Sequence, residues 1–392
     1  MKIILAPDSF KGTLTATEVC GILADEFAVS FPAAEICLLP LADGGEGLAA
    51  AVHRLRGGRW LEAAVAGPWG KPVQAAFLLL PDGTAVLETA SCAGLELARG
   101  APEGLNPART TTQGLGELLL AARASGAARI LLGLGGSATN DGGCGMADAL
   151  GWRFLRADDT GFLPTGATLT EIARILPPDE PYGLPVTAAC DVTSPLFGPD
   201  GAAHVYAPQK GADPAMVLLL DTGLQHLAAV CGEQALAWEP GAGAAGGLGF
   251  GVRRFLGGEL RPGIDLLLDM ADFDALVRGN ALVVTGEGRM DAQTLQGKAP
   301  CGVLRRAQRR GVPVIAVCGC AEEPDALLAA GFSAIFPASG GGQALEVLQR
   351  HCREELRQAA RQAADWIVRT TRTHHEGSAS NDILISERME ST

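Results

Sequence analysis

Alternating strand and helix patterns at both ends of the 392-residue chain constrain its fold more than any other feature. At the amino-terminal end, the apolar run "KIILAP" precedes a helical pattern from Thr15 to Ala28, and "EICLLP" precedes another from Gly47 to Leu55. Strands that alternate with helices in this way are typical of a parallel sheet with helices on its faces. The chain is therefore predicted to begin a doubly wound α/β fold.

The carboxyl-terminal part repeats this alternation. It reads as a strand "ALVVTG", a helix "APCGVLRRAQRRG", a strand "VPVIAVCG", a short helix "PDALLAAG", a strand "SAIFPAS" and a long amphipathic helix from Ala344 to Val368. Because chain termini often lie close together, both ends are predicted to complete one doubly wound, Rossmann-like parallel sheet.

The middle of the chain has a different pattern. The segment "VQAAFLLLPDGTAVLETA" predicts an antiparallel hairpin with Asp82 and Gly83 at its tip. We therefore expect two domains: residues 1–67 and 270–372 as a discontinuous Rossmann-like domain, and residues 68–269 as an inserted mixed α/β domain. The polar segment 373–392 lacks apolar periodicity and is predicted to be a disordered tail.

Composition excludes several classes of partner. A formal net charge of -13 argues against nucleic acid or an anionic membrane surface. The start "MKIILAPDSFKG" is too short for the apolar core of a signal peptide, and no apolar run is expected to span a membrane. Ten cysteines without a CxxC pair indicate reduced thiols rather than disulfides or zinc, so a cytoplasmic location is predicted and a homo-oligomer is left open.

A glycine loop, "GLGGSATNDGG", directly follows the apolar run "ARILL". Glycine backbone at the start of a helix can bind a phosphate or carboxylate, and the alternative is a tight strand-to-helix turn. The candidate anion-binding residues of this loop are Gly135, Gly136, Ser137, Asn140 and Asp141.

Two dinucleotide fingerprints are present, but both lack the expected context. "GAGAAG" at 241–246 follows Pro240 rather than a strand, and "GLGGSA" at 133–138 has no second strand ending in an acidic residue downstream. A nicotinamide-dependent hydroxy-acid dehydrogenase is therefore the weaker alternative. "QGKAP" has Ala299 where a P-loop needs Ser or Thr, so no Walker motif is present.

Polar residues follow several predicted strands, where open α/β sheets bind ligands. Ser9 and Lys11 follow the first strand, and Asp191 ends "PVTAAC"; a Pro-initiated turn and a helix or turn cap are the alternatives. Lys210 in "PQKGA" is an anion-binding candidate or a surface lysine. The acidic glycine loops add the candidate metal ligands Asp43, Glu46 and Glu287.

The densest polar stretch is "VVTGEGRMDAQTLQGKAP", which follows a buried strand. It holds Glu287, Arg289, Asp291 and Lys298, more alternating charge than solubility requires, and this pattern predicts a functional site. Anion cradles, cations and metal-holding carboxylates are the parts that phosphoryl transfer needs.

Taken together, seven motifs resemble the type-1 family of glycerate kinases, in order and in spacing, from residue 1 to about residue 370. They are "APDSFKG", "LADGGEG", "GLGGSATNDGG", "ACDVTSPLFGP", "PQKGA", "GAGAAGGLG" and "GEGRMDAQTLQGKAP". The resemblance implies two α/β domains with the active site in the cleft between them. It also implies transfer of the γ-phosphoryl group of ATP to D-glycerate, with Mg, to give 2-phosphoglycerate and ADP.

The resemblance also suggests roles for the candidate residues. Asp191 is expected to act as base or metal carboxylate, with Asp291 as its rival, and Lys210 and Arg289 to pair with phosphate or the glycerate carboxylate. Ser9, Lys11, Lys298 and the loop from Gly135 to Asp141 are expected to bind substrate or phosphate. The alternative from another class is a module that binds a small hydroxy acid, or is regulated by one, without chemistry.

Overall fold

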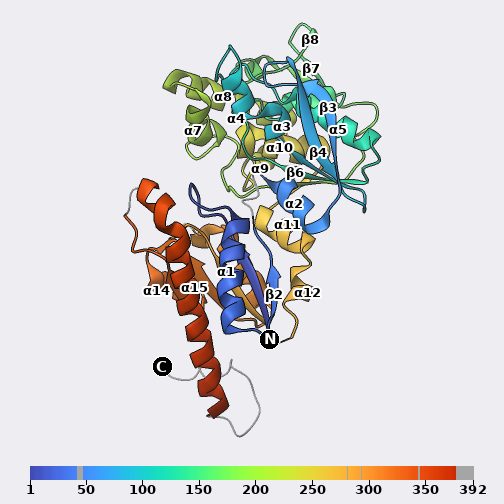
Figure 1. Ribbon diagram of the computed structural model, residues 1–392. Helices are drawn as coiled ribbons and strands as arrows, with labels where there is room; N and C mark the ends of the chain where they lie inside the picture. Colours follow the sequence, from blue (N-terminus) through green and yellow to red (C-terminus); the bar gives the residue numbers. More distant parts are fainter. Residues whose placement is uncertain (42–46, 280, 293, 343–344, 377–392) are drawn as a thin grey trace. The chain divides into compact units, whose positions relative to one another are not determined.

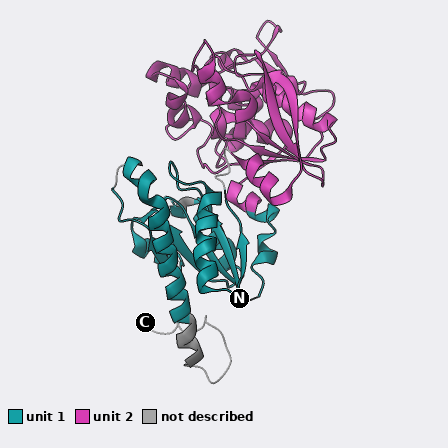
Figure 2. Ribbon diagram, in the orientation of Figure 1, with its two compact units in different colours: residues 1–42, 268–392 teal, residues 43–267 magenta. Residues whose placement is uncertain are grey.

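The structure is a computed structural model that describes residues 1–41, 47–279, 281–292, 294–342 and 345–376 (Figure 1). The chain divides into two compact units. Unit 1 comprises residues 1–42 and 268–392, and unit 2 comprises residues 43–267 (Figure 2). Each unit has its own sheet and its own hydrophobic core.

Unit 1 is built on a five-stranded sheet in the order β16-β14-β12-β1-β2, and every pairing in it is parallel. The chain extends the sheet from β1 to β2 on one side and later adds β12 on the other side of β1. This is the strand order of a doubly wound, flavodoxin-like sheet, whose switch point lies between β1 and β12. The strands are β1 (Lys2–Pro7), β2 (Glu35–Leu38), β12 (Ala281–Gly286), β14 (Val314–Cys318) and β16 (Ala334–Pro337).

Helices cover both faces of this sheet because right-handed crossovers in opposite directions place their helices on opposite faces. α1 begins with a capping box between Thr15 and Glu18 and packs beside α15 (Figure 1). α13 connects β12 to β14 and contacts both of these strands and β1. The helices of unit 1 are α1 (Ala16–Ser30), α12 (Phe273–Leu276), η3 (Thr294–Gln296), α13 (Ala299–Gln308), α14 (Pro324–Ala329) and α15 (Leu345–Glu376). Two short strands, β13 (Arg289–Met290) and β15 (Cys320–Ala321), lie outside the main sheet.

Unit 2 is built on a six-stranded mixed sheet in the order β11-β10-β6-β5-β4-β3. β5, β6, β10 and β11 run parallel, whereas β3 and β4 are antiparallel neighbours at one edge. The predicted hairpin is confirmed, since β4 and β5 pair with Leu79 opposite Ala85 and Gly83 turns with a φ of 81°. The strands are β3 (Arg59–Ala66), β4 (Pro72–Leu79), β5 (Thr84–Glu88), β6 (Arg129–Gly133), β10 (Val186–Ala189) and β11 (Glu259–Arg261), with β7 (Arg153–Leu155), β8 (Gly161–Phe162) and β9 (Arg174–Leu176) in a separate small sheet.

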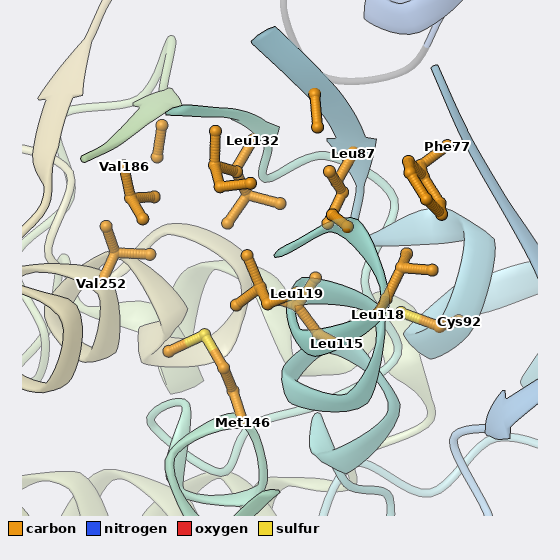
Figure 3. Close-up of a cluster of buried hydrophobic side chains, with 14 of the residues drawn as sticks. Phe77, Leu87, Cys92, Leu115, Leu118, Leu119, Leu132, Met146, Val186 and Val252 are labelled. Atoms are coloured by element: carbon orange, nitrogen blue, oxygen red, sulfur yellow. The ribbon is translucent and has the colours of Figure 1, made fainter. Parts of the chain in front are cut away.

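The core of unit 2 lies between this sheet and four of its helices, α3, α5, α6 and α10. Figure 3 shows Leu87, Leu132 and Val186 from neighbouring strands facing Leu119 of α5 and Met146 of α6. The helices are α2 (Leu48–Arg56), α3 (Ala90–Ala93), α4 (Leu95–Gly100), α5 (Gln113–Ala124), α6 (Cys144–Ala149), η1 (Leu169–Glu171), α7 (Ala202–Tyr206), η2 (Pro208–Lys210), α8 (Pro214–Cys231), α9 (Gln234–Ala237), α10 (Ala244–Leu256) and α11 (Gly263–Met270).

The boundaries between the units differ from the predicted ones. β3 pairs with β4 along its whole length, from Arg59 opposite Leu79 to Ala66 opposite Pro72, and α2 contacts β4 and β5. Residues 48–66 therefore belong to unit 2 and not to the Rossmann-like domain. β3 was missed because it is an edge strand with mostly exposed or half-buried side chains, so its sequence does not alternate clearly.

Two further predictions about single segments need correction. α8 is an 18-residue helix that is long and apolar enough to cross a membrane by length and composition, although no such run was expected. It contacts η1, α7 and α9, and its Leu220, Leu224 and Leu227 are fully buried in unit 2. At the other end, α15 extends to Glu376, so residues 373–376 of the predicted tail are helical, and residues 377–392 lie outside the described part.

Candidate functional site

The first group of candidate residues lies at the switch point of the unit 1 sheet. Pro7 ends β1 beside Gly286, the last residue of β12, and the amide of Asp8 donates to the Gly286 carbonyl at 2.8 Å. Asp8 and Glu287 therefore follow adjacent strands at their carboxyl ends. Asp8 is only 9% exposed. This is the position at which open α/β sheets bind ligands.

Glu287 is a partly buried carboxylate that is held by its own loop. Its Oε1 accepts a hydrogen bond from the Thr294 hydroxyl at 2.6 Å, and Lys298 Nζ lies 3.6 Å from its Oε2. Burial raises the pKa of Glu287, and the charge of Asp8 raises it further, whereas Thr294 and Lys298 act in the opposite direction. A cation at this point would relieve the repulsion between the two carboxylates.

The loop from residue 287 to residue 298 brings together the charged residues predicted from its sequence. Lys298 Nζ lies 3.8 Å from Asp291 Oδ1, and Arg289 Nε lies 3.8 Å from Asp291 Oδ2. The Arg289 guanidinium is 62% exposed and pairs at 2.7 Å with Glu322. Lys298 therefore bridges Glu287 and Asp291, while Arg289 forms an exposed ion pair beside them.

Ser9 and Lys11 lie against the same loop. The Ser9 amide donates to Asp8 Oδ1 at 2.6 Å, and Lys11 is exposed. A Cβ atom on Gly288 would lie 3.2 Å from the Phe10 Cα and 3.3 Å from the Lys11 amide nitrogen. Glycine at 288 therefore lets the 8–12 segment pack closely on the loop that carries Glu287.

The second group of candidate residues lies in unit 2, in the glycine loop that follows β6. The loop turns through three glycines with positive φ: Gly136 at 71°, Gly142 at 63° and Gly143 at 78°. Gly136 is exposed and Gly135 is half-buried, whereas Ser137, Thr139, Asn140 and Asp141 are buried. Five consecutive buried positions, 137–141, with four polar side chains require either internal partners or a ligand.

Asp141 is fully engaged inside the protein. Its carboxylate accepts hydrogen bonds from the amide and hydroxyl of Thr112, both at 2.8 Å, and from the amides of Gly143 at 3.1 Å and Gly145 at 3.2 Å. Burial raises its pKa, and these four donors oppose the rise. Through these four hydrogen bonds Asp141 joins this loop to the start of α5, so its carboxylate has a structural role and is not the phosphate ligand that the sequence suggested.

Lys210 is a buried cation and not the surface lysine considered as its alternative. It is 3% exposed, and its Nζ donates to Ser137 Oγ at 2.9 Å and to the Thr139 carbonyl at 2.8 Å. Burial lowers the pKa of Lys210 to about 7, and the charge of Asp141 acts against this. In the described ranges, no carboxylate lies within ion-pair distance of Lys210.

Asn140 is the least satisfied polar residue of the loop. It is 0% exposed, and among the described residues neither its Oδ1 nor its Nδ2 has a hydrogen-bond partner. The Thr139 hydroxyl is also buried without a partner in the described part of the chain. An unpaired buried amide is costly, so a water or a ligand is expected to complete these hydrogen bonds.

The fingerprint "GAGAAG" at 241–246 packs directly on this loop. Ala245, Gly246 and Gly247 all have positive φ, of 53°, 72° and 87°. The Gly142 amide donates to the Gly246 carbonyl at 3.1 Å, and a Cβ on Gly246 would lie 2.0 Å from the Thr139 carbonyl oxygen. The glycine at 246 lets the backbones of the two loops touch. In the described chain no strand leads directly into this fingerprint, as a dinucleotide site would require.

Asp191 follows β10, the parallel neighbour of β6, and is exposed. Its Oδ1 accepts a hydrogen bond at 2.8 Å from the amide of Gly263, the first residue of α11. The capping role considered for Asp191 is therefore present in the structure. One carboxylate can cap a helix through one oxygen and still contact a ligand through the other, so this contact does not exclude a catalytic role.

The candidate metal ligands are only partly described. Asp43 and Glu46 fall within residues 42–46, which lie outside the described residues. Across the ranges with described coordinates, no three His, Cys, Asp or Glu side chains are close enough to hold a metal ion by themselves. Within the described residues, the candidate metal site therefore consists of the carboxylates of Glu287 and Asp8.

The sequence did not single out Asp8 or Thr112, whereas Thr294 lies in the dense polar stretch that predicts a functional site. Asp8 could have been found by the rule that selected Asp191, because it too follows the end of a strand. Thr112 holds the Asp141 carboxylate across a sequence separation of 29 residues, and no local pattern marks it. A cavity of about 570 Å³, lined by residues that include Gly58, Arg59 and Ser125, lies at the amino-terminal edge of the unit 2 sheet, opposite to the edge at which the glycine loop follows β6.

Comparison with known proteins is consistent along the whole chain. The model of the glycerate kinase family matches residues 3–368. A glycerate kinase from Bacillus subtilis (strain 168) is 42% identical over 93% of this chain and 97% of the relative, and glycerate 2-kinase from Escherichia coli (strain K12) is 41% identical over 81% of this chain and 85% of the relative. A crystal structure assigned as glycerate kinase 2 from Salmonella typhimurium LT2 superposes with a TM-score of 0.79 at 37% identity, covering 95% of this chain and 99% of that one.

Proposed function

The chain belongs to the glycerate kinase family, and from this premise we propose that it transfers the γ-phosphoryl group of ATP to D-glycerate, giving 2-phosphoglycerate and ADP. The observation that carries the proposal is the buried cation Lys210 at the end of η2, which donates a hydrogen bond to a glycine loop with unpaired polar atoms. A kinase whose net charge is -13 needs such local positive charge to bind two anionic substrates.

We propose that Glu287 and Asp8 provide protein oxygens for Mg²⁺. The fit rests on their chemistry: two carboxylates at one switch point, one of them with its pKa raised by burial and by the other's charge. Mg²⁺ prefers oxygen ligands and is commonly held by one or two carboxylates together with substrate phosphates. When bound, the ion neutralises charge on the phosphates; Lys298 and Lys11 are the nearby cations that would pair with phosphate oxygens.

The roles in unit 2 follow from its geometry. Lys210 would bind an anionic group of a substrate, Ser137 and the backbone of Gly135 and Gly136 would line the same site, and Asp141 would keep the loop in shape. Asp191, at the end of β10, would orient or deprotonate the acceptor hydroxyl. Arg289 and Asp291 remain candidates for phosphate pairing and for the base. The prediction that the active site lies between the two domains stays a prediction.

A coupled assay of ADP release tests the reaction. We expect ADP only when ATP, Mg²⁺ and D-glycerate are all present, and the product should carry its phosphate on the C2 hydroxyl by phosphorus NMR. ATP hydrolysis that does not depend on glycerate would contradict the proposal, as would glycerate binding without any turnover, which is the behaviour of a binding module.

Two substitutions at Asp191 separate its capping role from a chemical role. Asp191→Asn keeps an oxygen that can accept from Gly263 but cannot take a proton, so kcat should fall by roughly 10²-fold or more with little change in melting temperature. Asp191→Ala also removes the cap and should cost a further ~1 kcal/mol of stability. A kcat for Asp191→Asn within about threefold of the unchanged protein would leave only the cap and favour Asp291 as the base.

A further inference from the structure

We infer that Asn140 and Lys210 form the subsite for the hydroxy-acid substrate, not for the nucleotide: Lys210 Nζ binds its carboxylate, and Asn140 Oδ1 accepts a hydrogen bond from one of its hydroxyls. This assignment rests on the proposed function and changes the expectation that the loop holds triphosphate. We call Ser137, Thr139, Asn140 and Lys210 the Asn140 subsite.

The unused hydrogen-bonding atoms of the Asn140 subsite define its ligand. Lys210 Nζ has three N–H donors and uses two, on Ser137 Oγ and the Thr139 carbonyl. Asn140 adjoins Thr139 in the chain and leaves both its amide N–H₂ and its carbonyl oxygen without a partner in the described part of the protein. The subsite therefore offers several donors, a positive charge, two hydroxyls that can donate or accept, and one group that can only accept, the Asn140 carbonyl oxygen.

The Asn140 carbonyl oxygen, which can accept but not donate, distinguishes the two substrates. The triphosphate of ATP presents acceptor oxygens in its ionised form, so it would satisfy Lys210 and Asn140 Nδ2 but leave Asn140 Oδ1 unpaired. A hydroxy acid presents a carboxylate that accepts and hydroxyls that donate, which matches the whole set. Leaving a buried acceptor unpaired is the more costly arrangement, and the hydroxy acid avoids it.

The surroundings keep this subsite rigid. Backbone packs closely around Asn140, since a Cβ on Gly246 would lie 2.7 Å from its Cα and a Cβ on Gly166 would lie 3.1 Å from its carbonyl oxygen. The four donors to Asp141 fix the next residue. Positive φ at Ala245, beside these contacts, is a strained conformation of the kind that persists at ligand sites.

The test is isothermal titration of the intact protein with D-glycerate, with propionate, which has the carboxylate but no hydroxyl, and with MgATP. We expect the unchanged protein to bind D-glycerate at least tenfold more tightly than propionate. Asn140→Leu should weaken D-glycerate binding about tenfold or more, bring it close to propionate, and leave the Kd of MgATP within about twofold.

A matched control is available in the same unit. Thr84 is 1% exposed, and its hydroxyl is also buried without a partner in the described part of the chain, but it begins β5 at the opposite edge of the sheet. Thr84→Val should leave the binding of all three ligands unchanged. If Asn140→Leu does not fold, Asn140→Asp keeps the shape, adds a negative charge to the proposed carboxylate subsite, and should weaken D-glycerate binding by at least tenfold.

Each other result overturns the assignment. Weaker MgATP binding with unchanged D-glycerate binding would make this a nucleotide subsite, and unchanged binding of both would mean that a buried water completes Asn140. The proposed function fails separately: if the unchanged protein binds D-glycerate as described but releases no ADP with MgATP, the subsite stands and the kinase reaction does not.

Discussion

Lys210 shows how one buried residue can make substrate binding depend on pH. Its pKa of about 7 lies well below the ordinary lysine value because burial desolvates the charged ammonium. The negative charge of Asp141 raises the pKa, but by less than burial lowers it. An anionic ligand that contacts Nζ favours the charged form and raises this pKa. If the acid binds at Lys210 as proposed, its binding is therefore expected to be coupled to proton uptake near neutral pH.

We predict that D-glycerate binds most tightly below about pH 7, where Lys210 is charged in the free protein. Above that pH the affinity should fall by up to about tenfold per pH unit, because each binding event must then take up a proton. Titration calorimetry between pH 6 and pH 9 in buffers of different ionisation enthalpy measures both the Kd and the proton uptake. No nucleotide is added, so titration of phosphate does not contribute.

Lys210→Met supplies the control for this pH dependence, because it removes the titrating group and keeps an apolar chain of similar length. The variant should bind D-glycerate weakly at every pH, without a transition near pH 7. In the free protein the folded pKa lies below the unfolded one, so unfolding takes up protons and the unfolding free energy should rise with pH between about 7 and about 10. If the pH transition in D-glycerate binding persists in Lys210→Met, a group other than Lys210 causes it.

At the scale of elements, α10 begins with a turn that no standard helix contains. Residues 245–247 have left-handed φ values, and this turn places the Gly246 backbone against Thr139 and Gly142. The two glycine-rich motifs therefore stabilise each other, because the left-handed turn at residues 245–247 lets the loop with Thr139 and Gly142 pack on it. The shape of the Asn140 subsite depends on this contact between loops that are about a hundred residues apart in the sequence.

Two glycine-to-alanine substitutions in and beside α10 test this contact. Gly246 and Gly257 both have positive φ, of 72° and 63°, but a Cβ would lie 2.0 Å from the Thr139 oxygen at Gly246 and would meet nothing within 4 Å at Gly257. Gly257→Ala should cost ~1 kcal/mol from backbone strain alone, and Gly246→Ala ~3 kcal/mol or more. Urea unfolding measures the loss of unfolding free energy in each variant. Equal losses would mean that the close contact between the two loops does not contribute to stability.

The sequence predicted elements well where local chemistry determines them. The end strands, the hairpin with Asp82 and Gly83, and the helix that begins after Thr15 follow from apolar runs, turn residues and a capping box. The partners of side chains depend instead on tertiary contacts. The bonds from Lys210 to Ser137 and from Thr112 to Asp141 span 73 and 29 residues, so the sequence identified Lys210 and Asp141 as candidates but could not show that one is a buried cation and that the other has a structural role.

At the scale of the whole molecule, the sequence predicted a discontinuous domain with an insertion but placed its first boundary too late. Patterns of single elements do not show which sheet an edge strand joins, and β3 has few buried side chains to indicate its partner. The structure shows that α2 and β3 belong with the inserted segment, since they contact β4 and β5. Unit 2 is therefore one continuous segment of chain with its own core.

We predict that a fragment of residues 47–270 folds without unit 1, because it keeps the six-stranded sheet, its core and all of α11. Four of the five tryptophans lie in this range, and two of them pack on Phe255 and Phe197, so fluorescence during urea unfolding should show one cooperative transition. A fragment of residues 68–270, cut at the boundary expected from sequence, loses α2 and β3 and exposes the edge of β4. It should aggregate or unfold without cooperativity. If both fragments behave alike, β3 contributes nothing to the fold of unit 2.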